Sequence, residues 1–276
     1  MHKKSASHRL SNITNPALWA VHELAGLRLP DERLIKRAQL IMTQMGQRPG
    51  ASLPKACGNW GQTKAAYRFL DNDAVDPQRL LAAHTQATVS RMQTHALVLA
   101  LQDTTTLNYS AHPQTQGLGP ISNNRDKTLG LLLHSTLAVT VAGEPLGMLS
   151  AVASARDPRQ FGSSRQGQRR NGQPIAQKES RRWLDSLSIC QALDLVCPNT
   201  TIVNVADREG DIYDLMAQAL RSNQGRAAHA LVRSQHNRNV QGLDRRLWKH
   251  LSGQPLAGTL SVRTPRKTGV ASRVAT

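Results

Sequence analysis

Aromatic residues, acidic residues and paired cysteines are scarce in this chain. Only 3% of the 276 residues are Phe, Trp or Tyr, and 18 Asp and Glu stand against 35 Lys and Arg. The three cysteines, Cys57, Cys190 and Cys197, lack the C-x-x-C spacing of zinc and redox sites, so free thiols are expected. No histidine lies at finger spacing from a cysteine pair, which argues against a structural zinc site.

Long hydrophobic runs are also missing. No segment reaches the roughly 20 apolar residues that a membrane-spanning helix needs. The N-terminus has the positive residues of a secretory signal, but the apolar stretch that should follow them is not there. The sequence therefore predicts a cytoplasmic protein with no membrane partner.

Positive charge is what the chain has in excess. Its formal net charge of +17 and pI of about 11.0 exceed what solubility requires, and such a field attracts polyanions. The excess is concentrated in residues 156–182 and after Arg221, where Asp244 is the only acidic residue. Nucleic acid is the expected partner, although a solvated basic surface without a ligand is the ordinary alternative for either block.

The first 94 residues carry the signals of a small all-α domain. Asn15 precedes Pro16, and Asp76 precedes Pro77, so each pair joins a capping side chain to a proline that is tolerated in a first helical turn. Apolar periodicity predicts helices at 31–45, 64–70 and 77–92, with a Pro/Gly-rich break at 48–54.

Short apolar runs follow from residue 96 onward. Strands are expected at 96–102, 131–141, 145–152, 201–206 and 228–232, and helices at 175–193 and 211–221. This order predicts an α/β fold with a mixed sheet covered by helices.

Two aspartates stand where apolar runs end. Asp103 follows the 96–102 run and Asp207 follows the 201–206 run. If the two strands are neighbours, the carboxylates lie together and can hold the divalent ions, Mg²⁺ or Mn²⁺, that support attack on a phosphodiester. An aspartate after a strand also commonly caps the next turn, which is the ordinary explanation for each of them.

Five short motifs occur in a fixed order along the chain. They are Tyr67-Arg-Phe69, Asp103-Thr-Thr105, Lys178-Glu-Ser180 before Trp183, Asp207-Arg-Glu209 and Val232-Arg-Ser234. This series resembles the insertion-sequence 4 family of bacterial cut-and-paste transposases, and the likeness runs from about Leu24 to beyond Gly258. The resemblance implies a helical transposon-end DNA-binding domain at 1–94, a ribonuclease-H-like catalytic core at 95–240 and the start of a β insertion at 241–276.

The resemblance also implies roles for single residues. Asp103 and Asp207 correspond to the first two members of an Asp-Asp-Glu triad, which holds Mg²⁺ or Mn²⁺ during nicking, hairpin formation and strand transfer. DNA contacts are implied for Arg33, Arg37 and Arg68 in the helical domain and for Lys178, Arg182 and Arg233 in the core. The expected partners are double-stranded DNA, as terminal inverted repeats and as target, and a second protomer on that DNA.

The third carboxylate of the triad has no counterpart in this sequence. In the family it comes from a helix with a Tyr, Arg and Glu signature after the β insertion, and residues 256–276 correspond only to the opening of that insertion. We therefore expect a truncated transposase that binds DNA but is impaired in cutting it, with one apolar face of its sheet exposed. The alternatives are a non-catalytic regulator of transposition and a nuclease that completes its metal site with Glu209 or Asp211.

Overall fold

The structure is a computed structural model that divides into two units. It describes residues 16–112, 114–122, 128–158, 173–221, 229–243, 246–259, 261–264 and 273–275. The first unit extends to Arg233 and the second begins at Ser234. The predicted three-domain division at residues 94 and 240 stays a prediction.

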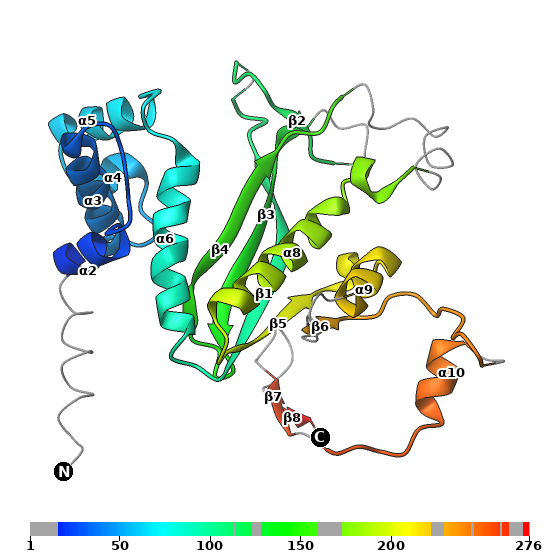
Figure 1. Ribbon diagram of the computed structural model, residues 1–276. Helices are drawn as coiled ribbons and strands as arrows, with labels where there is room; N and C mark the ends of the chain where they lie inside the picture. Colours follow the sequence, from blue (N-terminus) through cyan, green and yellow to red (C-terminus); the bar gives the residue numbers. More distant parts are fainter. Residues whose placement is uncertain are drawn as a thin grey trace, which may run out of the picture. The chain divides into compact units, whose positions relative to one another are not determined.

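A group of helices begins the first unit (Figure 1). These helices are α2 (Pro16–Glu23), α3 (Glu32–Gln47), α4 (Leu53–Cys57), α5 (Trp60–Leu70) and α6 (Pro77–Met92). The expected cap at Asp76 is confirmed, since its side chain accepts a hydrogen bond from the Gln78 N–H. Asn15 lies outside the described residues. α4 was not expected, because it begins within the Pro/Gly-rich break and uses Pro54 in its first turn.

The helices enclose a core of their own. Leu24, Leu27, Ile41 and Phe69 are buried together, with Leu34 packed against them. The apolar stripe predicted for 31–45 is therefore the inner face of α3.

A mixed sheet forms the centre of the first unit. Its strands are β1 (Leu97–Asn108), β2 (Gly119–Pro120), β3 (Leu129–Thr140), β4 (Pro145–Ser154), β5 (Thr201–Ala206) and β6 (His229–Val232). The order is β2-β3-β1-β5-β6, and β4 also pairs with β3. β1 runs antiparallel to β3 and parallel to β5, which in turn is parallel to β6. The predicted α/β class with a mixed sheet is confirmed, and the strand order is compatible with a ribonuclease-H-like core.

The helix α8 (Arg181–Val196) packs on one face of this sheet (Figure 1). Val98 and Ile202 lie beneath Cys190 of α8, and Trp183 of α8 packs with Leu215 of α9 (Tyr213–Leu220). Strand alternation places Leu101 and Leu231 on the opposite face, where they are 37% and 60% exposed. All three cysteines are free thiols, as expected, and all three are buried.

Two predicted boundaries are wrong. The helix expected at 175–193 is a short η1 turn (Ile175–Gln177) followed by α8, because Lys178 adopts an extended backbone with φ −94° and ψ 147°. The first strand does not end at Gln102, since the threonines after Asp103 continue to pair with β3 as far as Asn108. β-branched threonine is favoured in strands, so the apolar run understates the length of β1.

A buried ion cluster joins α2 and α6 to the sheet. Glu23 of α2 is 3% exposed, and its carboxylate accepts hydrogen bonds from Arg91 at 2.8 and 2.9 Å and pairs with the His84 ring. Arg91 also donates to the Leu146 carbonyl, and the Met148 N–H donates to His84 Nε2. We call Glu23, His84 and Arg91 the clamp, because they connect α2, α6 and β4.

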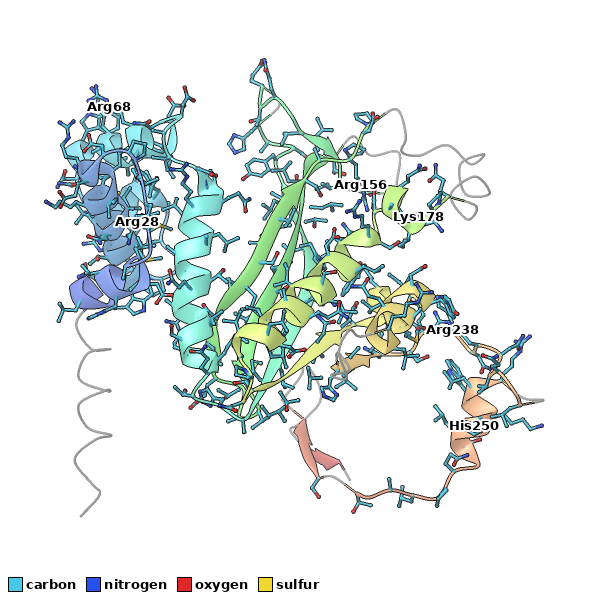
Figure 2. All side chains as sticks on the ribbon, in the orientation of Figure 1. Arg28, Arg68, Arg156, Lys178, Arg238 and His250 are labelled. Atoms are coloured by element: carbon cyan, nitrogen blue, oxygen red, sulfur yellow. The ribbon has the colours of Figure 1, made fainter. Side chains whose placement is uncertain are left out.

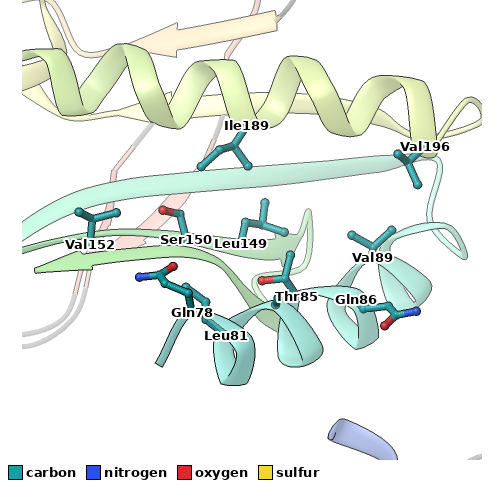
Figure 3. A pocket seen from close by; sticks show the side chains of 11 residues that line it. Gln78, Leu81, Thr85, Gln86, Val89, Leu149, Ser150, Val152, Ile189 and Val196 are labelled. Carbon is teal, nitrogen blue, oxygen red and sulfur yellow. The ribbon is translucent and has the colours of Figure 1, made fainter. Parts of the chain in front are cut away.

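An apolar cavity of about 580 Å³ lies beside this contact, between α6, β4 and α8 (Figure 3). Leu81 and Val89 of α6, Leu149 of β4 and Ile189 of α8 face it. Neither Asp103 nor Asp207 lines this cavity.

The second unit contains little regular structure among its described residues. α10 (Leu247–Ser252) begins where the Trp248 N–H donates to the Asn237 side chain, and β7 (Val262–Thr264) pairs antiparallel with β8 (Arg273–Ala275). In neither unit does the described chain form a helix long and apolar enough to cross a membrane.

Candidate catalytic and DNA-binding sites

The sheet brings Asp103 and Asp207 to neighbouring positions. β1 and β5 pair in parallel up to Gln102 and Ala206, so the next residue on each chain is an aspartate. Side chains at paired positions of parallel strands lie on the same face, and adjacent strands are about 4.8 Å apart. Both aspartates are exposed, and strand alternation along β1 places Asp103 on the face opposite α8.

The same row includes two further polar residues. Ser135 of β3 is paired with Asp103. Arg233 follows β6, and its N–H donates to the Ala206 carbonyl at 3.1 Å, next to Asp207. The predicted DNA contact Arg233 and the predicted metal ligands therefore lie in one row across β3, β1, β5 and the end of β6.

Asp207 also caps the turn that follows its strand, which is the ordinary explanation for an aspartate at this position. Its Oδ1 accepts a hydrogen bond from the Glu209 N–H at 2.8 Å and so caps the η2 turn (Arg208–Gly210). Glu209 is exposed, whereas Asp211 is only 5% exposed. Burial makes Asp211 a poor choice for a ligand that has to face DNA.

The donor set of this row fits a hard divalent cation in part. Carboxylate oxygens are what Mg²⁺ and Mn²⁺ prefer, and Mg²⁺ commonly takes one or two carboxylates with water and substrate phosphates as its other ligands. Within the part of the chain that the structure describes, no group of three or more His, Cys, Asp and Glu side chains could hold a metal ion. Among the described residues the candidate site is thus limited to two carboxylates.

A polar cavity of about 620 Å³ lies at the start of α8. Its lining includes three basic residues, Arg156, Lys178 and Arg182, and two acidic ones, Glu179 and Glu209. Figure 2 shows Arg156 and Lys178 near the start of α8. Arg156 forms a bidentate ion pair with Glu179, at 2.8 and 3.0 Å.

Arg182 is less well compensated than Arg156. Its nearest acidic oxygen, in Glu179, is 3.8 Å away, and its buried Nε has no hydrogen-bond partner among the described residues. Burial lowers the pKa of Arg182, because the charged guanidinium has lost part of its hydration in the folded chain. An anion in the cavity would reduce that cost.

The basic residues predicted on the helices differ in their surroundings. Arg33 is tied to its own helix cap, since its guanidinium donates to Asp31 at 2.7 and 2.9 Å. Arg37 donates to Gln62 at 2.6 Å and so links α3 to α5. Arg68 is exposed on the outer side of α5 (Figure 2).

The exposed side of α5 also carries two aromatic residues, Trp60, which the sequence did not single out, and Tyr67 of the Tyr67-Arg-Phe69 motif. Trp60 is 74% and Tyr67 is 50% exposed, and seven residues separate them, so they lie on one side of the helix with Lys64 between them. Exposed aromatic rings among Lys and Arg provide stacking and phosphate contacts for nucleic acid.

A comparison with known families shows what the helices before α6 are similar to. Residues 16–75 match the family model for transposase DNA-binding. The match covers α2 to α5 and ends just before Asp76, the cap of α6. DNA is therefore the partner that the match supports for this domain.

The transposase DNA-binding domain contains three of the predicted DNA contacts. Arg33, Arg37 and Arg68 lie inside the matched range, whereas Lys178, Arg182 and Arg233 lie outside it. Of the three inside, only Arg68 is exposed and has no hydrogen bond or ion pair with another described residue, so it is the strongest candidate. Trp60 was missed because a single tryptophan on a helix is not a motif, and only the fold shows that it is not in the core.

Proposed function

We propose that this chain is a transposase of the insertion-sequence 4 family whose DNA-binding domain recognises the terminal inverted repeats of its element. The match of residues 16–75 to a transposase DNA-binding domain is the observation that carries the proposal. The net charge of +17 supports it, because a field of that sign attracts duplex DNA. Two protomers on paired ends, a bacterial origin and capture of target DNA belong to the same proposal.

In this proposal α5 is the principal DNA-binding surface of the domain. Arg68 and Lys64 contact phosphates, which position the duplex, and the rings of Trp60 and Tyr67 cover sugar or base edges. α3 supports α5 from behind through the hydrogen bond between Arg37 and Gln62.

Replacing Arg68 with alanine is expected to weaken binding to any duplex and to reduce the slope of log K against log salt by about one, because one phosphate contact is lost. Fluorescence anisotropy with a labelled duplex over a salt series measures both quantities. Arg33→Ala is the matched control, since its charge is already paired with Asp31 and it should leave the slope unchanged. Equal effects from Arg33→Ala and Arg68→Ala would remove α5 from its assigned role.

The metal-dependent part of the proposal concerns Asp103 and Asp207. Mg²⁺ or Mn²⁺, when bound, would stabilise the negative charge that develops on a phosphate during attack by water or a hydroxyl. The two aspartates would supply the anchoring oxygens from neighbouring positions, one within β1 and one directly after β5, and Arg233 beside Asp207 would contact the DNA backbone. The polar cavity with Lys178 and Arg182 would hold a neighbouring phosphate.

The 276 residues are proposed to bind DNA without cutting it. Support comes from the carboxylate pair, which lacks a third acid among the described residues. Purified chain should leave supercoiled plasmid intact in Mg²⁺ and in Mn²⁺, and Asp103→Ala should bind the duplex as tightly as the native chain, because Asp103 is outside the matched domain.

Two outcomes of the plasmid assay would support a different function. Nicking that disappears in Asp207→Ala would support the two-carboxylate nuclease, with Glu209 as its third oxygen donor. Absence of nicking combined with suppression of transposition on co-expression with an active transposase would support the regulator. The exposed position of Glu209 beside Asp207 is the observation that keeps the nuclease as a second candidate.

A further inference from the structure

A chain of hydrogen bonds, buried except at its Thr104 end, crosses three strands next to Asp103. Thr104 Oγ1 is 2.8 Å from His134 Nδ1, and His134 Nε2 is 3.1 Å from Gln102 Oε1. Gln102 Nε2 donates to Asn204 Oδ1, and Asn204 Nδ2 contacts the Cys190 sulfur at 3.5 Å. We call Thr104, His134, Gln102 and Asn204 the strand network, because they connect β3, β1 and β5.

The donors and acceptors of the strand network form one consistent series. Gln102 gives its N–H to Asn204, so its oxygen faces His134 and has to accept. His134 therefore carries its proton on Nε2, and Nδ1 accepts from the Thr104 hydroxyl. Burial, reinforced by the Arg182 guanidinium, lowers the pKa of His134 to about 4, which keeps the imidazole neutral near neutral pH.

The network occupies positions that apolar residues could fill. Gln102 is 3%, His134 5% and Asn204 0% exposed, on the face that α8 covers. Desolvating these groups is unfavourable, and hydrogen bonds only compensate for it when every member is satisfied. What such a network supplies beyond an apolar core is a unique alignment of the strands that carry it.

The strand network lies next to Asp103, so the strand alignment that it fixes includes the backbone of that aspartate. Gln102 and Thr104 flank Asp103 in the chain, and strand alternation turns them to the α8 face while Asp103 faces away. Gln102 is in register with Ala206, the residue before Asp207, and reaches diagonally to Asn204 on β5. The β1 backbone is thus held on both sides of one aspartate, and β5 is held three residues before the other.

We infer that the strand network is a positioning device for the carboxylate pair, fixing Asp103 and Asp207 at the separation that a divalent cation needs. The inference rests on the proposed function, because it presupposes that these aspartates bind a metal ion. In this inference neither His134 nor Gln102 contacts the metal ion. Each acts by fixing the β1 and β5 backbone that carries the two aspartates.

Mn²⁺ affinity of the whole chain tests the inference without any need for DNA cleavage. Bound Mn²⁺ is measured by electron paramagnetic resonance during titration with Mn²⁺ alone. Gln102→Leu fills the same space but removes both amide links, and it is expected to weaken Mn²⁺ binding about tenfold, as the loss of outer-shell support does at other metal sites.

The matched control is Thr136→Val. Thr136 is fully buried on the same face of β3 and bonds Ser186, so its loss perturbs packing between the sheet and α8 without breaking the link between strands. Its Mn²⁺ affinity is expected to stay within about twofold of the native value. Equal losses in Thr136→Val and Gln102→Leu at similar melting temperatures would overturn the inference, because general destabilisation would then explain both.

A second variant keeps the test decisive if Gln102→Leu does not fold. Thr104→Val is isosteric and removes only the hydroxyl at the accessible end of the strand network. A loss of Mn²⁺ affinity greater than about twofold supports the inference, and native affinity overturns it.

Asp103→Asn and Asp207→Asn separate failure of the inference from failure of the proposed metal site. Both should remove specific Mn²⁺ binding. If they bind Mn²⁺ like the native chain, the metal site is wrong and the inference fails with it. If they lose binding while Gln102→Leu and Thr104→Val retain it, the metal site stands and only the positioning role is overturned.

Discussion

Glu23→Ala is expected to lower the free energy of unfolding of the first unit by about 2–3 kcal/mol, because the partly buried Arg91 guanidinium loses its counter-ion and the His84 ring loses its hydrogen-bond acceptor. Glu23 is 3% exposed and is the only acidic group of the clamp. Arg91 and His84 would remain next to the β4 backbone, which their side chains also contact. Urea denaturation followed by circular dichroism measures the change.

The clamp leaves little room for compensation by repacking. Gly147 of β4 has φ +143°, and a Cβ at this position would collide with Thr88 Oγ1 and approach the Arg91 guanidinium. The strand therefore lies against α6 at a distance that only glycine allows. A side chain from β4 cannot move in to replace the lost carboxylate.

A matched glutamate serves as the control. Glu32 also pairs with a basic residue, Lys36, but both side chains are more than two-thirds exposed, at 77% and 71%. Glu32→Ala should change the unfolding free energy by less than about 0.5 kcal/mol. A similar loss in both variants would mean that burial of Glu23 adds nothing.

Acid should weaken the clamp in a defined range. Burial alone would raise the pKa of Glu23, but hydrogen bonds from His84 and Arg91 lower it from 4.5 to about 2. A lowered pKa in the folded state means that the stabilisation is complete above pH 4.5 and is lost as pH falls toward 2. In Glu23→Gln the loss of stability over this range should be smaller than in the native chain by roughly 3 kcal/mol.

Trp183→Ala is expected to cost about 3–5 kcal/mol of unfolding free energy, through lost burial and the cavity left behind. The indole is 1% exposed and packs with Leu187 and Leu215, so it joins α8 to α9. It also meets the His134 ring edge-on, with centroids 4.9 Å apart. Thermal and urea unfolding measure the loss.

Trp60→Ala is the control for that variant, and it is expected to behave in the opposite way. Trp60 is 74% exposed, so its removal should change stability by less than about 0.5 kcal/mol. On the proposed function it should instead weaken DNA binding. Strong destabilisation by Trp60→Ala, or none by Trp183→Ala, would contradict the division between core and surface tryptophans.

The parts of this fold that depend on local sequence could be predicted. Apolar periodicity and the Asp76-Pro77 cap gave α3 and α6 nearly residue by residue, and the β5 strand was predicted with its observed bounds. The juxtaposition of Asp103 with Asp207 was predicted on the condition that their strands are neighbours, and β1 and β5 are neighbours. Their function as metal ligands stays a prediction.

What could not be predicted depends on register between distant segments. His134 and Asn204 are polar residues in largely apolar strands, and only strand pairing shows that Gln102 connects them. Arg233 lies beside Asp207 for the same reason. A shift of one residue would turn each of these side chains to the other face, so no local pattern contains the information.

The parallel pairing of β1 with β5 has a consequence for how the chain folds. β3 and β4 can pair with β1 as soon as they are synthesised, but β5 emerges roughly a hundred residues after β1, so closing that loop is a slow, non-local step. During this interval one edge of β1 has unpaired backbone groups that another strand could bind. Folding yield should therefore fall with protein concentration more steeply than the stability of the finished fold would indicate.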